Sequence, residues 1–321
     1  MASDAPKGPW PELPLEPWRG TLDALHLWSQ LVGKTLLSRC TPQNHWWHTA
    51  LRVSSRGLAS PAPTCDPEHA VDLELDLVDH MLHVRSGGHT RSMPLRSRSV
   101  HSFLDEYLSL LRADGVEPHL WTTPVEVPHP IPFDHDDAPR EYDPEAAHRF
   151  FQVLLRCDAT LRGLAAGYVG KQSPVHFFWG AFDLATTRFS GRRAPERTGA
   201  DLVTREAYSH EVISFGFWPG GETQAGIAVD EPVLYAYAAP EPAGFRDADV
   251  PAPAYWHPEL AEFLLPYEAV RTTRDPAARI LAFCEAVYEA GADLGGWDRD
   301  TLERTPRHMT GGEVETHPAP H

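Results

Sequence analysis

The sequence predicts an α+β protein made of two similar lobes, each an antiparallel sheet with flanking helices. Three observations lead to this fold class. Apolar residues at helical spacing and apolar residues alternating with polar ones occupy separate blocks of the chain. The order helix, several strands, helix occurs twice within the 321 residues. The segments that join helix to strand also share short strings, which predicts an approximate internal duplication.

The first lobe is expected over residues 21–117, after an N-terminal arm at 1–20 that is disordered or extended. Its first helix is predicted at 21–37, where Leu22, Leu25, Trp28, Val32 and Leu36 recur at helical spacing. The run "NHWWHTALRVSSRG" follows and is strand-like. Residues 71–77 alternate leucine or valine with acidic residues, which is typical of a half-exposed strand, and Gly87-Gly88 marks the turn of a meander. A helix at 99–113 closes the lobe.

A proline-rich connector is expected over residues 118–143. Its prolines, which exclude both a helix and a central strand, are Pro118, Pro124, Pro128, Pro130, Pro132 and Pro139. Apolar residues between them predict that the connector packs along the surface.

The second lobe is expected over residues 144–305, followed by a disordered tail at 306–321. A helix at 144–167 has apolar residues at steps of four and three. The stretch "SPVHFFWGAFDLATTRFSGR" (173–192) is then predicted as one central strand buried on both faces. The strings "HEVISFGFWPGG", "TQAGIAV" and "PVLYAYAAP" are further strand candidates, and a last helix is predicted at 276–290.

The repeated strings lie where each lobe passes from its first helix to its first strand. Gly33-Lys34, then Thr41-Pro42, then a histidine before two aromatic residues match Gly170-Lys171, Ser173-Pro174 and His176 with its two phenylalanines. The order is the same in both places. This match is the basis for predicting a duplication.

Composition excludes several classes of partner. The formal net charge is −17, and so acidic a surface repels phosphate backbones and anionic lipid. No run approaches the length of a membrane span, and the N-terminus lacks a secretory signal. The four cysteines form no spaced pair that would indicate disulfides or zinc. We therefore expect a cytoplasmic protein that binds neither nucleic acid nor a membrane.

His176, His210 and Glu211 are the candidate catalytic residues. His176 stands where a strand begins, and strand ends commonly open onto binding sites. His210 and Glu211 are neighbours at the start of another strand, so one of them can meet His176 across the sheet as a general base or a metal ligand. No fixed metal-ligand spacing occurs, and the metal and the cofactor stay open.

A second set of residues is expected to line a ligand site. A buried Asp183 needs a partner, and the repeat offers Arg52, with Arg188 as the alternative. Trp179 and Trp47 would line the site with aromatic surface. His45 and His48 lie in the matching segment, and they share one metal only if that segment bends.

Two functions remain open at this stage. In the first, the protein is an enzyme acting on a small organic molecule in an aromatic-lined cleft between the lobes, with or without a metal. In the second, it is a non-catalytic protein that binds a small molecule or a partner, and its His and Asp groups are structural. The sequence contains no glycine-rich nucleotide loop and no serine-hydrolase elbow. It leaves substrate, reaction and oligomeric state open.

Several long blocks resemble a known group of proteins. "NHWWH", "SPVHFFWGAFDLATTRFSGRRAP", "YSHEVISFGFWPGG" and "LPYEAVR" are similar to the signature blocks of a bacterial family of about three hundred residues. That family is a domain of unknown function. The resemblance extends over nearly the whole chain between the two tails, and it implies a family assignment without an activity, a cofactor or a catalytic residue.

Overall fold

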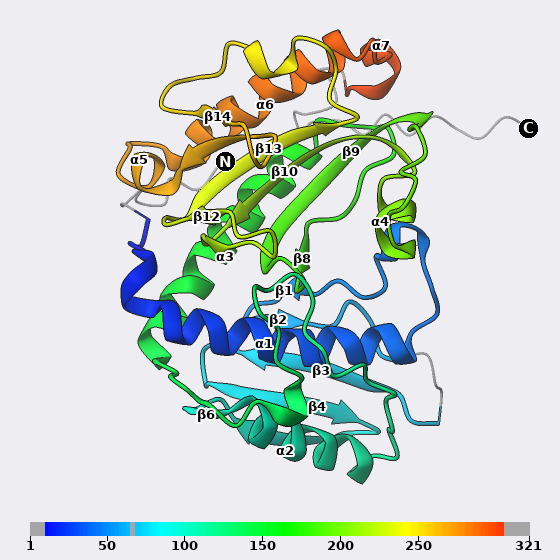
Figure 1. Cartoon of the computed structure of the whole chain (residues 1–321), viewed down its shortest axis with the longest axis vertical. Helices are drawn as coiled ribbons and strands as arrows, with labels where there is room; N and C mark the ends of the chain where they lie inside the picture. Colours follow the sequence, from blue (N-terminus) through cyan, green and yellow to red (C-terminus); the bar gives the residue numbers. More distant parts are fainter. Residues whose placement is uncertain (1–9, 65–67, 305–321) are drawn as a thin grey trace, which may run out of the picture.

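The computed structural model describes residues 10–64 and 68–304 and has an α+β fold (Figure 1). A five-stranded sheet of order β1-β2-β3-β4-β5 and a six-stranded sheet of order β14-β15-β13-β10-β9-β8 are antiparallel throughout. Within the described residues, no helix has both the length and the apolar character that a membrane crossing requires. The predicted arm residues 1–9 and the predicted tail lie outside the described residues.

The first half of the chain forms the five-stranded sheet and two helices. Its elements are α1 (Leu15–Arg39), η1 (Asn44–Trp46), β1 (Arg52–Val53), β2 (Gly57–Ala59), β3 (Val71–Asp76), β4 (Met81–Ser86), β5 (His89–Pro94), β6 (Arg98–Ser99) and α2 (Val100–Ala113). The alternating run at 71–77 forms β3 at 71–76, as predicted, but the expected half exposure was wrong: Glu74 and Asp76 are buried, because Arg85 and Arg56 pair with them. Gly87 and Gly88 both have positive φ in the β4–β5 turn, a conformation that glycine adopts without strain. The side chain of Ser99 caps α2 by accepting from the Ser102 N–H.

The proline-rich connector lies against α1. It contains only η2 (Phe133–His135) and β7 (Pro139–Arg140), which pairs with β6. Gln30 of α1 holds its backbone through two hydrogen bonds to Val125, at 2.8 and 2.9 Å. Lys34 of α1 donates to the Thr123 carbonyl at 2.8 Å. Side chains of the helix thus satisfy backbone groups that the prolines leave without a strand partner.

The second half forms the six-stranded sheet and its helices. Its elements are α3 (Pro144–Ala165), β8 (His176–Phe178), β9 (Asp183–Arg193), α4 (Leu202–Ala207), β10 (His210–Trp218), β11 (Gly221–Glu222), β12 (Ala228–Val229), β13 (Val233–Ala239), η3 (Phe245–Asp247), β14 (Tyr255–His257), β15 (Glu262–Pro266), α5 (Tyr267–Arg271), α6 (Pro276–Leu294) and α7 (Arg299–Leu302). Both halves therefore run helix, antiparallel meander, helix. The internal duplication itself stays a prediction.

The two faces of the six-stranded sheet have different surroundings. Helices α3 and α6 pack against β9, β10 and β13 on one face. Ile213, Phe215 and Phe217 of β10 point to that side and join the main core. Because side chains alternate along a strand, the intervening residues point to the other face, which we call the outer face. There the buried residues form only two small clusters edged by half-buried aromatic rings.

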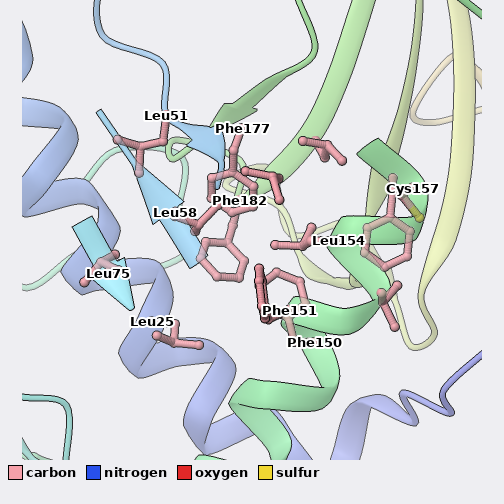
Figure 2. Packing of buried hydrophobic residues seen from close by; sticks show 14 of the residues in the cluster. Leu25, Leu51, Leu58, Leu75, Phe150, Phe151, Leu154, Cys157, Phe177 and Phe182 are labelled. Atoms are coloured by element: carbon pink, nitrogen blue, oxygen red, sulfur yellow. The ribbon is translucent and has the colours of Figure 1, made fainter. Parts of the chain in front are cut away.

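In the described part of the chain, one pair of residues joins the backbones of the two sheets. Leu51, just before β1, and Phe177 of β8 exchange both backbone hydrogen bonds, at 2.8 and 2.9 Å. Figure 2 shows the core at this junction, where Leu58 of the small sheet lies near Phe177 and Phe182. Leu75 lies farther into the small sheet and belongs to the same cluster as the α3 residues Phe150 and Leu154. The two halves thus share one hydrophobic core.

Three local predictions were wrong. Helix α1 begins at Leu15, so residues 15–20 are helical and not part of an arm. The stretch predicted as a single strand from Val175 to Ala185 is the hairpin β8–β9, with a turn at 179–182 in which Phe182 has a φ of 60°. The run at 44–49 is the 3-10 helix η1 (Asn44–Trp46) followed by a turn at 47–49, and not a strand.

Candidate functional site

Lys171 and His45 form a close pair beside the outer face. The Nζ of Lys171 lies 2.6 Å from Nε2 of His45. The Nδ1 of the same ring lies 3.1 Å from the carbonyl oxygen of Glu206. A carbonyl can only accept, so Nδ1 carries the hydrogen and Nε2 is the acceptor that faces the lysine. His45 is therefore a neutral imidazole with a fixed tautomer.

The backbone at His45 is held in an unusual conformation. His45 and Trp46 have φ angles of 56° and 62°, and each such left-handed non-glycine residue costs roughly 1–2 kcal/mol. The His45 N–H donates to Oε1 of Glu206 at 3.1 Å, which fixes η1 against α4. The Glu206 backbone and side chain together aim the imidazole at Lys171.

Aromatic rings surround the pair. The His45 ring lies 4.6 Å from that of Phe189 and 5.3 Å from that of Trp47, between ring centroids. The Nζ of Lys171 lies 4.8 Å from the Phe189 centroid and 5.7 Å from that of Trp47, distances typical of cation–π contacts. Burial lowers the pKa of His45, and the charge of Lys171 lowers it further. Lys171 as a residue is exposed, but partial burial of its amine among these rings lowers its pKa.

His176 lies on the far side of Trp47. Its ring centroid is 6.1 Å from the Trp47 centroid and 5.8 Å from that of Phe178. The residue is 3% exposed, and its Nδ1 is buried without a hydrogen-bond partner in the described part of the chain. Burial, followed by the charge of nearby Arg52, lowers the pKa of His176 to about 4. His176 is therefore a neutral ring at pH 7.

His210 completes a row of rings. Its centroid is 5.9 Å from that of His45, in an edge arrangement, and its Nδ1 lies 3.0 Å from the Ser209 hydroxyl. Burial lowers the pKa of His210, and Lys171 and Arg193 add to this effect. The structure thus lines up His210, His45, Trp47 and His176, whereas the sequence predicted that either His210 or Glu211 meets His176 directly.

Asp183 has neither of the predicted arginine partners. It pairs with Phe178 across the hairpin and therefore shares the outer face with His176, where the single-strand prediction had put the two residues on opposite faces. The hydroxyl of Tyr235 donates to Oδ2 of Asp183. The Tyr235 ring reaches it by lying over Gly216, where a Cβ would come within 2.3 Å of the ring. Burial raises the pKa of Asp183 to about 7, and Glu126 contributes to this shift.

Arg188 and Glu211 belong to structural contacts on the opposite face. Arg188 points toward the helices, where it donates to the Leu164 carbonyl at 2.7 Å and stacks on Tyr288 at 4.3 Å. Glu211 accepts from the Ser190 hydroxyl and from Arg192, at 2.8 and 2.9 Å. Neither side chain can reach the outer face, because successive strand residues point apart.

The other predicted lining residues divide between the site and the core. Trp47 lines the site, and Arg52 is exposed beside His176. Trp179 is a packing residue that lies on Gly33 of α1 and donates to the Thr49 carbonyl at 2.8 Å. His48 accepts from the Gln43 N–H at 3.1 Å. Although the segment bends, His45 and His48 have separate partners, and among the described residues no three His, Cys, Asp or Glu side chains are placed to hold a metal ion.

Three candidate residues of the site were not predicted from the sequence. Lys171 was used only as part of the repeated Gly-Lys string, although the chain has just three lysines among 28 basic residues, and this rarity was a usable signal. Glu206 and Tyr235 reach their partners over separations of 161 and 52 residues, and no local pattern reports such contacts.

Comparison of the sequence with known proteins identifies a family and no individual relative. Residues 10–304 match a family described as a family of unknown function, DUF5996. No curated protein and no solved structure matches the chain significantly. The matched region includes every described residue of the site and nearly all of the chain. This protein therefore belongs to DUF5996, a family of unknown function.

Proposed function

We propose that the protein is an enzyme acting on a small organic molecule, with the amine of Lys171 as its reactive group and His45 as the base that exchanges a proton with it. The observation that carries this proposal is the 2.6 Å contact between Nζ and Nε2, with the imidazole fixed by Glu206 at its other nitrogen. A nucleophile, a base and a group that orients the base are the parts that covalent catalysis requires.

A carbonyl compound is the substrate class that suits an amine. Lys171 gives a proton to Nε2 of His45, and the free amine donates its electron pair to the carbonyl carbon. One proton passes from the attacking nitrogen to the carbonyl oxygen, which gives a neutral carbinolamine. Protonated His45 then returns its proton to the carbinolamine hydroxyl, the C–O bond breaks, water leaves, and a protonated imine remains. His210, half-buried next to His45, is positioned to exchange protons during the loss of water. The rings of Trp47 and Phe189 offer apolar surface to the substrate.

The lowered pKa of Lys171 supports this role, since only the unprotonated amine attacks a carbonyl. Each unit by which a lysine pKa falls gives about tenfold more free amine at pH 7. Cys157 and Cys284 are buried thiols that form no disulfide, which suits a reducing compartment, so we place the enzyme in the bacterial cytoplasm as part of the proposal.

Imine trapping tests the proposal. The protein is incubated at pH 7 with glyoxylate and sodium cyanoborohydride, and peptide mass spectrometry measures the rate of adduct formation at each lysine. Lys171 should react several-fold faster than Lys7, and His45→Gln should bring its rate down to that of Lys7.

Lys171→Met is the control for adduct assignment, and Lys34 is a second internal reference. If Lys171 reacts no faster than Lys7, and His45→Gln changes nothing, the catalytic proposal is wrong. The pair is then structural, as in the non-catalytic binding hypothesis.

A further inference from the structure

A second group of polar side chains occupies the outer face away from Lys171. It consists of three carboxyl groups and three phenols, which we call the carboxyl–tyrosine cluster: Asp183, Glu262, Glu126, Tyr235, Tyr237 and Tyr208. Besides the Tyr235–Asp183 hydrogen bond, the hydroxyls of Tyr208 and Tyr237 lie 2.9 Å apart. The rings of Tyr235 and Tyr237 stack with centroids 6.2 Å apart. Their polar groups and ring faces thus lie along one stretch of sheet.

The carboxyl groups of the cluster have no cationic partner. Among the described residues, none of Asp183, Glu262 and Glu126 forms an ion pair, although acids elsewhere pair with arginines, as Asp76 does with Arg56 at 2.5 Å. Burial raises the pKa of Glu262 to about 8, and the charge of Asp183 contributes. Glu126 is an exposed residue, whereas Asp183 is buried and Glu262 half-buried. Two carboxyl groups that are withdrawn from water and repel one another stay partly protonated until a positive charge reaches them.

His176 adds an independent reason to expect a ligand. Its side chain is 97% buried on the same face, and its ring contacts that of Phe178 edge-on. The register of the hairpin puts it two residue pairs from Asp183, which is the next position on that face. Its Nδ1 is a buried polar atom without a partner in the described segments, and leaving such an atom unpaired costs free energy. Because the ring is neutral at pH 7, it can accept a hydrogen bond from a ligand N–H.

Aromatic faces next to carboxylates suit a cation that carries a carbon frame. Tyrosine rings attract ammonium and guanidinium groups through their negative faces. The outer side of Tyr208 already shows such a contact, since the guanidinium of the exposed residue Arg197 lies 3.9 Å from its ring centroid. Phe178 and Trp218, both half-buried, extend the aromatic surface beside Asp183.

We infer that the carboxyl–tyrosine cluster binds a small organic cation, an amine or a guanidine compound. Asp183 and Glu262 neutralise its charge, Tyr235 and Tyr237 contact its carbon frame, and His176 accepts one of its N–H groups. The inference goes beyond the proposed function, because it uses neither Lys171 nor His45. Binding of the cation and reactivity of Lys171 can therefore succeed or fail separately.

Titration calorimetry with agmatine and butylamine at low salt tests the inference, with 1-butanol as the uncharged control. We expect saturable binding of the two cations and none of butanol. Asp183→Asn and Glu262→Gln should each weaken binding about tenfold or more, as loss of a charge-assisted hydrogen bond does. The matched control is Glu211→Gln, which alters a carboxylate on the opposite face of the same sheet and should leave affinity unchanged.

Proton release distinguishes this site from unspecific attraction to an acidic surface. Binding near pH 7 should release protons from Asp183 and Glu262. The release is measured as a dependence of the binding heat on the ionisation enthalpy of the buffer. It should disappear in the variant that combines Asp183→Asn with Glu262→Gln. The titratable groups around these carboxyls are Glu126, Tyr208, Tyr235 and Tyr237, and the only charged group stacked on one of these phenols in the described part of the chain is Arg197, on Tyr208. Equal affinity in Asp183→Asn, equal binding of butanol, or a response to MgCl₂ alone would each overturn the inference.

Discussion

The segments at 45–47 and 176–178 have the same pattern, a histidine followed by two aromatic residues, and adopt different structures. In the first, His45 and Trp46 are left-handed residues of the turn η1, and His45 is aimed at Lys171. In the second, His176 and its neighbours form the strand β8, and Phe177 is fully buried. The two segments differ because they have different hydrogen-bond partners. The strand β8 pairs with β9, whereas η1 has no strand partner among the described residues and is held by Glu206 from the second half of the chain. The same residue pattern thus positions the His45 side chain for contact with Lys171 in one place and forms part of the hydrophobic core in the other.

The largest difference between the segments should be in stability. Phe177 is 0% exposed and packs edge-on against Phe182 at 5.0 Å, so Phe177→Ala should lower the free energy of unfolding by about 3–5 kcal/mol. The matching residue Trp46 is half-buried, and Trp46→Ala should cost about 1 kcal/mol. Urea denaturation of both variants measures this. Equal costs would show that η1 supports the fold as much as β8 does.

The histidines should differ in their effect on the pH dependence of stability. The pKa of His176 is about 4 in the folded protein, against 6.5 as its ordinary value. Between these two pH values the unfolded chain binds a proton that the folded chain does not, so stability falls as the pH drops from 6.5 to 4, by on the order of 2–3 kcal/mol. His176→Gln should remove this loss.

His45→Gln is the comparison for that experiment. The pKa of His45 is lowered too, so His45→Gln should change the pH dependence of stability in the same direction as His176→Gln. The two histidines differ in that both ring nitrogens of His45 have partners. Asp183 has the opposite effect, because its raised pKa makes stability increase as the pH falls through this range. This contribution is present in wild type and in both variants, so it cancels when their stabilities are subtracted. A His176→Gln profile parallel to that of wild type would contradict the assignment of a buried neutral ring.

The smallest effects should come from the two lysines of the repeated Gly-Lys strings. Burial lowers the pKa of Lys34 to about 8, and its Nζ donates to the Thr123 carbonyl. Lys34→Met should cost about 1 kcal/mol at pH 7 through loss of that hydrogen bond. Lys171 is exposed, and Lys171→Met should change stability by less than about 0.5 kcal/mol.

The pH dependence separates the two lysines further. Between pH 8 and 10.5 the unfolded chain retains a proton that folded Lys34 has lost, so wild-type stability gains on that of Lys34→Met as the pH rises through this range. Thermal unfolding at pH 7 and pH 9.5 measures the gain. A constant difference between the two proteins would show that Lys34 is as well solvated as a surface lysine.

Regular elements with a clear period could be predicted from the sequence. Helices α2, α3 and α6 and strands β3, β10 and β13 lie where apolar spacing placed them, because each buries one face against a core that its own pattern implies. The hairpin β8–β9 could not be predicted in this way. Its turn is made by Trp179 and Phe182 around Gly180, with none of the prolines or asparagines that commonly mark turns.

The sequence predicted which types of residue form the candidate site, but it did not predict which side chains contact each other. The aromatic surroundings of His176 and Trp47 followed from the blocks that contain them. Asp183 was correctly expected to need a partner, but the structure supplies the phenol of Tyr235 in place of an arginine. Which side chains meet depends on the register between β9, β10 and β13, and Gly216 permits the meeting only because it has no side chain.

The contact between Leu51 and Phe177 has a consequence for how the chain avoids aggregation. Each sheet ends at this junction in a very short strand, β1 or β8, whose unpaired backbone groups would otherwise be open to other chains. By pairing there, each half covers the exposed edge of the other, and the edges left over are β5 and β14. Either half produced alone would expose its inner edge together with part of the shared core. We therefore expect the halves to be insoluble when separated and to recover solubility when expressed together.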